Sequence, residues 1–382
     1  MKVMKRIALL ALVLVLSIVG TVCAAEDTIR IGVYGPLSGD SAMVGATMVE
    51  GIQLAVDEFN EAGGIDGHLI ELFIEDDEQS PKVAVNAVNK LIYEDNVIGI
   101  IGTVNSSCVL QSMEVSWDAE VPHITPIGSN TSITHKGNPW IARLQASDAL
   151  QAGAITRYAV EDLGAKKIAV IFQSDDYGTG GAETVKQVLA DEYGMEPVAY
   201  EPFEPSALDV SAQVLNIKNA DADAIIIYSM YQQGALVAKK VRELGMDAPL
   251  MGCGGLTNAK LFELGGEAVV GLVNTQTFFA DASKAAPAAA EFIEKFQAKY
   301  DGRIPDSNNA MAYDSARVMI EGLKYSYEKE GDFVNTAIME GIKSVKDMPL
   351  ATGNITIDEN GDANRDILII GITEDGGYTL VK

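Results

Sequence analysis

The sequence predicts an α/β protein with two doubly wound domains, each a parallel sheet covered by helices. Short runs of β-branched residues, such as KKIAVIFQ (166–173) and DAIIIYSM (223–230), alternate with segments of helical periodicity. Strands covered by helices on both faces have such continuous apolar runs. The 382 residues, 48% of them hydrophobic, exceed the usual size of one domain, so two domains are expected.

In the first half, strands and helices follow one another closely. Apolar residues recur at helical spacing over 43–61, and Pro81 occupies a plausible first position of the helix that follows it. We expect strands at 28–39, 68–78, 96–102 and 121–126, a turn at 62–68, and helices at 43–61, 83–93 and 106–117.

The second half repeats this pattern and then departs from it. We expect strands at 166–173, 196–203 and 223–230, and helices at 149–163, 180–193, 210–219 and 233–244. After an apolar run at 269–278, three helices follow with little strand between them, at 285–300, 308–327 and 333–342. The chain ends in short strands at 353–358, 365–372 and 376–382, separated by turn residues.

The first 25 residues have the three parts of a secretory signal: basic MKVMKR, apolar IALLALVLVLSIVG and the small-residue end TVCAA. The apolar run is short for a membrane-spanning helix. Lipidation at Cys23 is the alternative, although Val22 stands where such sites prefer a small residue. We expect a periplasmic or otherwise extracytoplasmic protein with residues 1–25 removed.

Charge and cysteine content exclude several classes of function. The formal net charge is −26, and it becomes −29 when the three basic residues of the signal leave. Such a chain repels nucleic acid and anionic membranes. Only Cys108 and Cys253 then remain, too few for a disulfide scaffold, and the three histidines lack zinc spacing. We expect no metal, no cofactor and buried thiols.

Polar residues follow three of the expected strands. The segments are 104–107 (VNSS), 127–130 (IGSN) and 173–181 (QSDDYGTGG). Ligands of open α/β sheets lie beyond the carboxyl ends of the strands, at helix N-termini. A serine at a helix start is most often only a cap, but two neighbouring strand ends that both carry serine favour an anion site. Tyr177 is placed to contribute to such a site, whereas core packing is the alternative for Tyr228 and Tyr231.

Enzyme signatures are absent. The sequence has no GxSxG elbow, no GxxxxGK[ST] loop and no HExxH, and its early glycines are too widely spaced for dinucleotide binding. The acidic run Asp76–Glu78 lacks a glycine-centred calcium loop, so a solvated strand end is expected there. A cysteine nucleophile, Cys108 or Cys253, lacks an assignable general base. We therefore expect a binding protein and no enzyme.

The order of these segments resembles the periplasmic solute-binding proteins of the leucine/isoleucine/valine-binding type, the extracytoplasmic receptors of ABC importers. The resemblance covers nearly the whole mature chain. The segments that carry it are IRIGVYGPLSG (29–39), GGIDGHLIELFIEDDEQSP (63–81), GTVNSS (102–107), VPHITPIGSN (121–130), DDYGTGG (175–181), VRELGMDAPLMGCGG (241–255) and AMAYDSARVMIEGL (310–323).

The resemblance implies a type I periplasmic-binding-protein fold, with two lobes joined by a three-stranded hinge. Lobe one would contain residues 28–146 and 274–350, and lobe two residues 147–273 and 351–382. The ligand's carboxylate would bind at Ser106 and Ser129, beside Ser107 and Val104, and the carbonyl of Ile127 would accept from an ammonium group. Lobe two would add Tyr177 and a residue at Met230 or Tyr231.

Two positions depart from the family pattern. An acid that usually holds the ligand's ammonium is replaced by Gly254, beside Cys253, and an aromatic residue is replaced by Val44. A buried ammonium without a carboxylate partner is costly. Either another acid substitutes, with Asp176 as the candidate, or the ligand has no α-amino group.

The resemblance therefore implies capture of a small carboxylate-bearing solute by hinge closure. The ligand would be a branched-chain or other amino acid, or a non-amino carboxylate. The expected partner is a membrane permease of an ABC importer, and the protein is expected to be a monomer. The alternative is a ligand-sensing receptor for an amide or amino acid that acts through a separate signalling partner.

Overall fold

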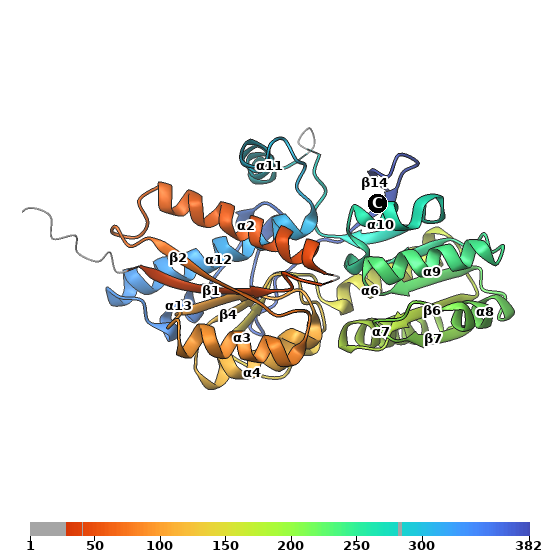
Figure 1. Ribbon diagram of the computed structural model, residues 1–382, viewed down its shortest axis with the longest axis horizontal. Coiled ribbons are helices and arrows are strands. Elements are labelled where there is room, and N and C mark those ends of the chain that lie inside the picture. The colour runs from red at the N-terminus through yellow and green to blue at the C-terminus, as the bar shows by residue number, and fades with distance from the viewer. Residues whose placement is uncertain (1–27, 40, 282–284) are drawn as a thin grey trace, which may run out of the picture.

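Two separate sheets divide the chain into two lobes that lie side by side (Figure 1). The computed structural model describes residues 28–39, 41–281 and 285–382. The expected signal peptide and Cys23 lie outside these residues. The α/β class and the two-lobed architecture expected from the sequence are confirmed.

The first sheet has five parallel strands in the order β2-β1-β3-β4-β5. Its strands are β1 (Ile29–Gly35), β2 (Ile70–Asp76), β3 (Gly99–Gly102), β4 (His123–Thr125) and β5 (Ile141–Arg143). The helices of this lobe are α2 (Ala42–Glu61), α3 (Pro81–Tyr93), α4 (Ser106–Asp118), α5 (Ser132–His135), α11 (Pro287–Lys299), α12 (Ser307–Glu330) and α13 (Asn335–Lys343). Helices α2 and α12 pack along one another on one face, and α3 and α4 pair on the other (Figure 1).

The second sheet has seven strands in the order β14-β13-β10-β9-β8-β6-β7. Its strands are β6 (Ile168–Gln173), β7 (Ala199–Phe203), β8 (Ala224–Tyr228), β9 (Leu250–Gly252), β10 (Val273–Gln276), β13 (Leu368–Ile372) and β14 (Tyr378–Leu380). The first five are parallel, whereas β13 and β14 are antiparallel to their neighbours. Every residue of β6 and β8 is buried, as their continuous apolar runs predict.

Helices of the second lobe cover both faces of this sheet. They are α6 (Asp148–Arg157), the π-helical turn η1 (Tyr158–Asp162), α7 (Asp176–Tyr193), α8 (Ser211–Asn219), α9 (Tyr231–Glu243), the 3₁₀ turns η2 (Gly254–Leu256) and η3 (Gly266–Val269), and α10 (Lys260–Gly265). Helix α7 begins four residues before the expected start at 180, because Asp175 caps it by accepting from Gly178 N–H at 2.9 Å.

Strand pairing shifts both late boundaries between the lobes. Residues 274–276, assigned to lobe one from the sequence, belong to β10 and pair with β13 in the second sheet. Residues 351–363 pack on lobe one: Ala351 N–H donates to Asp314 at 2.9 Å, and Arg143 forms a parallel β-bridge with Asp362. A two-stranded hairpin, β11 (Met348–Leu350) and β12 (Gly353–Ile355), lies in this region.

The contact between α2 and α12 depends on one glycine. A Cβ atom added at Gly51 would lie 2.2 Å from the carbonyl oxygen of Asn309. The side-chain amide of Asn309 also donates to the carbonyl of Thr47 at 2.8 Å. Helix α12 is thereby held against α2, with its N-terminus directed at the region between the lobes (Figure 1).

A buried arginine joins the two chain segments that cross near the first sheet. Arg143, fully buried at the end of β5, donates through Nε to Asp362 at 2.8 Å. Its Nη1 donates to the carbonyls of Ser129 and Asn130 at 2.9 and 2.6 Å. Main-chain bonds continue the pairing, since Arg143 N–H donates to Gly361 O at 2.8 Å. This guanidinium therefore fixes the loop after β4.

We predict that Arg143→Met lowers the free energy of unfolding by roughly 3–5 kcal/mol, because it leaves a carboxylate and two carbonyls without their buried partner. Arg157→Met is the matched control: Arg157 pairs with Glu192 at 2.5 Å, but both side chains are more than one-third exposed. Its expected cost is below about 1 kcal/mol. Urea unfolding measures both. Equal effects would contradict a special role for Arg143.

Candidate ligand-binding site

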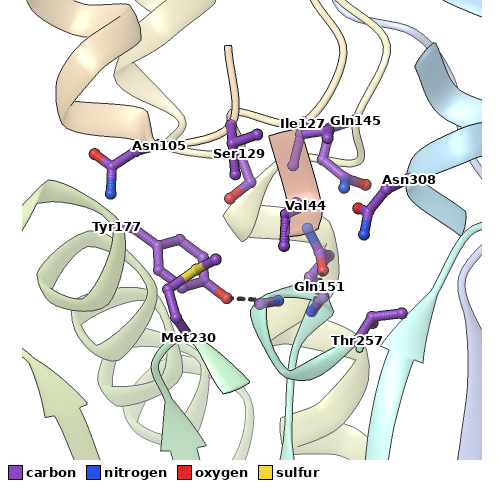
Figure 2. Close-up of a pocket in the computed structure, with 13 residues that line it drawn as sticks. Val44, Asn105, Ile127, Ser129, Gln145, Gln151, Tyr177, Met230, Thr257 and Asn308 are labelled. Atoms are coloured by element: carbon purple, nitrogen blue, oxygen red, sulfur yellow. Dashed lines mark hydrogen bonds between the residues drawn. The ribbon is translucent and has the colours of Figure 1, made fainter. Parts of the chain in front are cut away.

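A cavity lies between the lobes, beyond the carboxyl ends of the parallel strands. Residues of both lobes line it, and Figure 2 shows their side chains converging. The lining residues are Val44, Val104, Asn105, Ile127, Ser129, Gln145, Gln151, Tyr177, Met230, Gly254, Gly255, Thr257 and Asn308. This position is the one that the open α/β architecture predicts for a ligand.

The two serine-bearing strand ends meet, as the sequence indicated. Strand β3 pairs with β4, and the Ser106 hydroxyl accepts from the N–H groups of Ser129 and Asn130 at 3.3 and 3.2 Å. Ser129 lines the cavity, whereas Ser106 is buried behind it and is not among the lining residues. The Ser106 side chain thus shapes the loop that carries Ser129.

Asparagine Asn105 occupies the N-cap of α4, and its side chain accepts from Ser107 N–H at 2.9 Å. The strand end below is held by Asp77, which accepts from the Thr103 hydroxyl and from Gln79 N–H. The acidic run that includes Asp77 therefore closes a turn beside the site. Val104 and Asn105 are fixed at the cavity wall by these contacts.

Helix α7 of the second lobe begins directly opposite. Tyr177 lines the cavity, its ring lies 4.9 Å from that of Tyr228, and its hydroxyl oxygen accepts from Gly255 N–H at 3.0 Å (Figure 2). Met230, the N-cap residue of α9, also lines the cavity. Tyr231 follows as the first residue of the helix and is buried outside the lining.

Polar contacts connect the lobes beside the cavity. Asn130 Nδ2 donates to the carbonyl of Asp176 at 2.6 Å, and Asp176 N–H donates to the Ser107 hydroxyl at 3.3 Å. Ser107 therefore contacts the opposite lobe and does not line the cavity. Asp176, the candidate replacement for the missing acid, is also absent from the lining. The two lobes therefore contact one another beside the cavity.

The position of the missing acid is occupied by a glutamine from another element. Gln151 of α6 accepts through Oε1 from Gly254 N–H at 2.9 Å and from the Thr275 hydroxyl at 3.1 Å. Its Nε2 donates to the carbonyl of Ala146 at 2.8 Å. A Cβ atom added at Gly254 would lie 3.0 Å from Gln151 Oε1. The glutamine amide therefore takes up the space that a side chain at Gly254 needs.

Four polar lining residues were missed by the sequence analysis. They are Gln145, Gln151, Thr257 and Asn308. Gln145 lies on the first crossing between the lobes, and Asn308 is the second residue of α12, far along the chain from the strand ends. Only Asn308 could have been predicted, because polar residues at the start of a helix can face a ligand.

Across the residues that the structure describes, no helix is both long and apolar enough to cross a bilayer. The chain matches the model of the periplasmic binding protein family over residues 28–377. The chain belongs to this family. Periplasmic binding proteins act outside the cytoplasm and bind small molecules, so the expected family and the extracytoplasmic location that it implies are supported.

Among its relatives, this periplasmic binding protein is 30% identical to the Leu/Ile/Val-binding protein BraC3 of Rhizobium johnstonii, over 88% of this chain and 89% of the relative. It is 29% identical to Leu/Ile/Val-binding protein homolog 3 of Brucella melitensis, over 97% and 98%. A solved leucine-binding protein of Thermotoga maritima superposes with a TM-score of 0.85 at 29% identity, over 93% of this chain and 98% of that one.

A buried carboxyl behind Ser129 predicts a pH dependence. Asp148 accepts from the Tyr228 hydroxyl at 2.7 Å, and its own N–H donates to Ser129 O at 2.8 Å. Burial raises its pKa to about 6, although the nearby hydroxyls of Tyr228 and Ser129 and the Arg143 charge lower it. The Asp148 carboxyl therefore stabilises the fold more when it is protonated than when it is ionised.

A carboxyl with a higher pKa in the folded state binds more protons when folded, so its contribution to stability falls as pH rises from about 4 to about 6 and is constant above. In Asp148→Asn this contribution is removed. We predict that the difference in unfolding free energy, wild type minus variant, decreases over that range in urea unfolding at pH 4 to 7. A constant difference would contradict the prediction.

Both mature cysteines are fully buried. Burial raises the pKa of Cys253 to about 12 and raises the pKa of Cys108 as well. The thiolate is the reactive form, so we predict that neither thiol reacts with a chromogenic disulfide reagent in the native mature chain, while both react in denaturant. Rapid reaction of either thiol under native conditions would instead favour a nucleophilic role.

Proposed function

We propose that this periplasmic binding protein is the extracytoplasmic substrate-binding component of an ABC importer and captures a small carboxylate-bearing solute by hinge closure. The observation that carries the proposal is the cavity, which is walled by residues of both lobes at the carboxyl ends of two sheets. A ligand held there contacts both lobes, so its binding energy favours the closed arrangement.

The lobe-one wall suits a carboxylate. Helix α4 begins at the Asn105 cap, and the first N–H groups of a helix have no partners within it. These groups and the Ser129 hydroxyl offer donors at the positive end of a helix, which favours an anion. Figure 2 shows Ser129 directed into the same space as Tyr177 and Gln151.

The relatives bear on the solute class. Two are named for leucine, isoleucine and valine binding, and one for leucine binding. These names support an amino acid or a related carboxylate as the solute. They also support a membrane permease as the partner, to which the closed monomer would be presented. Export by the signal at residues 1–25 would deliver the protein to the periplasm, with a lipid anchor at Cys23 as the alternative.

The test is thermal melting of the mature chain with a panel of small carboxylic acids, with and without α-amino groups. A ligand at about a hundred times its dissociation constant should add roughly 2.7 kcal/mol to the stability and raise the melting midpoint. Small-angle scattering should show a smaller radius of gyration with the best ligand than without it, and an unchanged radius would contradict hinge closure. If amides shift the midpoint and no carboxylate does, the sensing receptor for an amide becomes the better proposal.

We further predict that Ser129→Ala weakens binding of that carboxylate by about tenfold or more, because a hydrogen bond to a charged group is worth roughly 1.5–3 kcal/mol. Ser116→Ala is the matched control: Ser116 is a buried serine of α4 whose hydroxyl donates to Met113 O at 2.9 Å, away from the cavity. Titration calorimetry measures both. Equal affinities of the two variants would argue against Ser129 as a ligand contact.

A further inference from the structure

We propose that the ligand is a small apolar monocarboxylate without an ammonium group, and that Gln151 and Gly254 set this specificity. The inference rests on the proposed capture of a carboxylate and narrows it. It depends on three features of the cavity wall: the absence of an acid, the helix ends that meet there, and the packing of Gln151 against Gly254.

The cavity wall offers amides and hydroxyls but no acid. Among the thirteen lining residues, all of them described, none is Asp, Glu, Lys or Arg. The polar side chains are those of Asn105, Ser129, Gln145, Gln151, Tyr177, Thr257 and Asn308. A buried ammonium needs a carboxylate to offset its loss of water. The wall therefore lacks the group that an α-amino acid requires.

Two acids close to the lining residues, half-buried Asp175 beside Asn105 and buried Asp148 beside Ser129, do not reach the cavity. Asp175 caps α7 through Gly178 N–H and accepts from Gln173 Nε2 at 2.6 Å. Asp148 accepts from the Tyr228 hydroxyl and is fully buried. Neither residue lines the cavity. A substitute acid for Gly254 is therefore not found among the residues in contact with the cavity.

Several helices direct their N-termini at the cavity. Asn105 is the N-cap of α4, Met230 is the N-cap of α9, and Asn308 is the second residue of α12. All three line the cavity. The N-terminus of a helix carries a partial positive charge, so the combined field stabilises an anion and repels an ammonium. The positive helix ends and the absence of an acid both favour a ligand that has a carboxylate and no ammonium group.

Gln151 completes this neutral wall. Its Oε1 accepts two hydrogen bonds and its Nε2 donates one, so the orientation of the amide is fixed. A Cβ atom at Gly254 would approach Oε1 to 3.0 Å, so a side chain there requires the Gln151 amide to shift. The two residues are therefore coupled. A glutamate at position 151 keeps the two accepting contacts and places a carboxylate at the wall.

The remaining lining residues are apolar. They are Val44, Val104, Ile127 and Met230, with the ring of Tyr177 beside them. Such a surface suits a hydrocarbon or aromatic body. Together with the helix ends, it indicates a ligand with one carboxylate and an otherwise apolar skeleton.

The experiment is titration calorimetry of the mature chain with matched ligands. The sets are leucine, 4-methyl-2-oxopentanoate and 4-methylpentanoate, and phenylalanine, phenylpyruvate and 3-phenylpropanoate. We expect at least one acid without an amino group to bind at least tenfold more tightly than the amino acid of its set. In Gln151→Glu, that preference should shrink by tenfold or more. Gln213→Glu on α8 makes the same charge change away from the cavity and should leave the preference unaltered.

The outcomes separate the two proposals. Tighter binding of an amino acid in each set overturns this inference and leaves carboxylate capture intact. Binding of no member overturns both. A wild-type preference for the deaminated acids that survives unchanged in Gln151→Glu overturns the role of Gln151. The wild-type titrations decide the ligand class even when Gln151→Glu does not fold. In that case the double variant Gly254→Glu with Gln151→Ala replaces it, because it places a carboxylate on the cavity wall at position 254.

Discussion

The buried guanidinium of Arg143 is the interaction on which the site most depends. It binds the carbonyls of Ser129 and Asn130 from one side, while the Ser106 hydroxyl accepts from their N–H groups on the other. Asp362 balances its charge from a segment far along the chain. A buried charge is stable only when its hydrogen-bonding groups are paired in this way. Arg143 therefore fixes the loop that presents Ser129 and connects this loop to the segment that contains Asp362.

A second constraint is that the strands of both sheets end at the same cavity. The carboxyl ends of both sets of parallel strands face the same cavity, and the helices that follow them begin there. Direct polar contacts, such as the one between Asn130 and Asp176, connect the lobes around it. A bound solute would add contacts to both lobes at once. In the proposed function, closure and ligand capture are therefore a single event in energetic terms.

Selectivity within this family fold depends on side chains that come from outside the strand ends. The strand ends and helix starts supply donors for an anion whatever the solute is. In the specificity proposed above, the group that distinguishes one carboxylate from another lies opposite, where Gln151 packs on Gly254. Fold alone does not identify the ligand, because function depends on such local chemistry.

The amino-acid sequence was enough to predict the alternation of strands and helices and the meeting of the two serine-bearing segments. The first follows from local periodicity, and the second from the rule that the carboxyl ends of parallel strands lie on the same side of a sheet. It also indicated Ile127, Ser129, Tyr177, Met230 and Gly254, which all line the cavity.

Features that depend on contacts between distant segments became apparent only in the folded protein. Residues 274–276 and 351–363 lie in the opposite lobe to the one expected, because strand pairing and burial, which local pattern does not encode, select their position. The Ser106 hydroxyl bonds to the neighbouring loop, which helix docking determines. Gln151 and Asn308 reach the cavity only because α6 and α12 pack against the strand ends, so tertiary packing alone established the neutral wall.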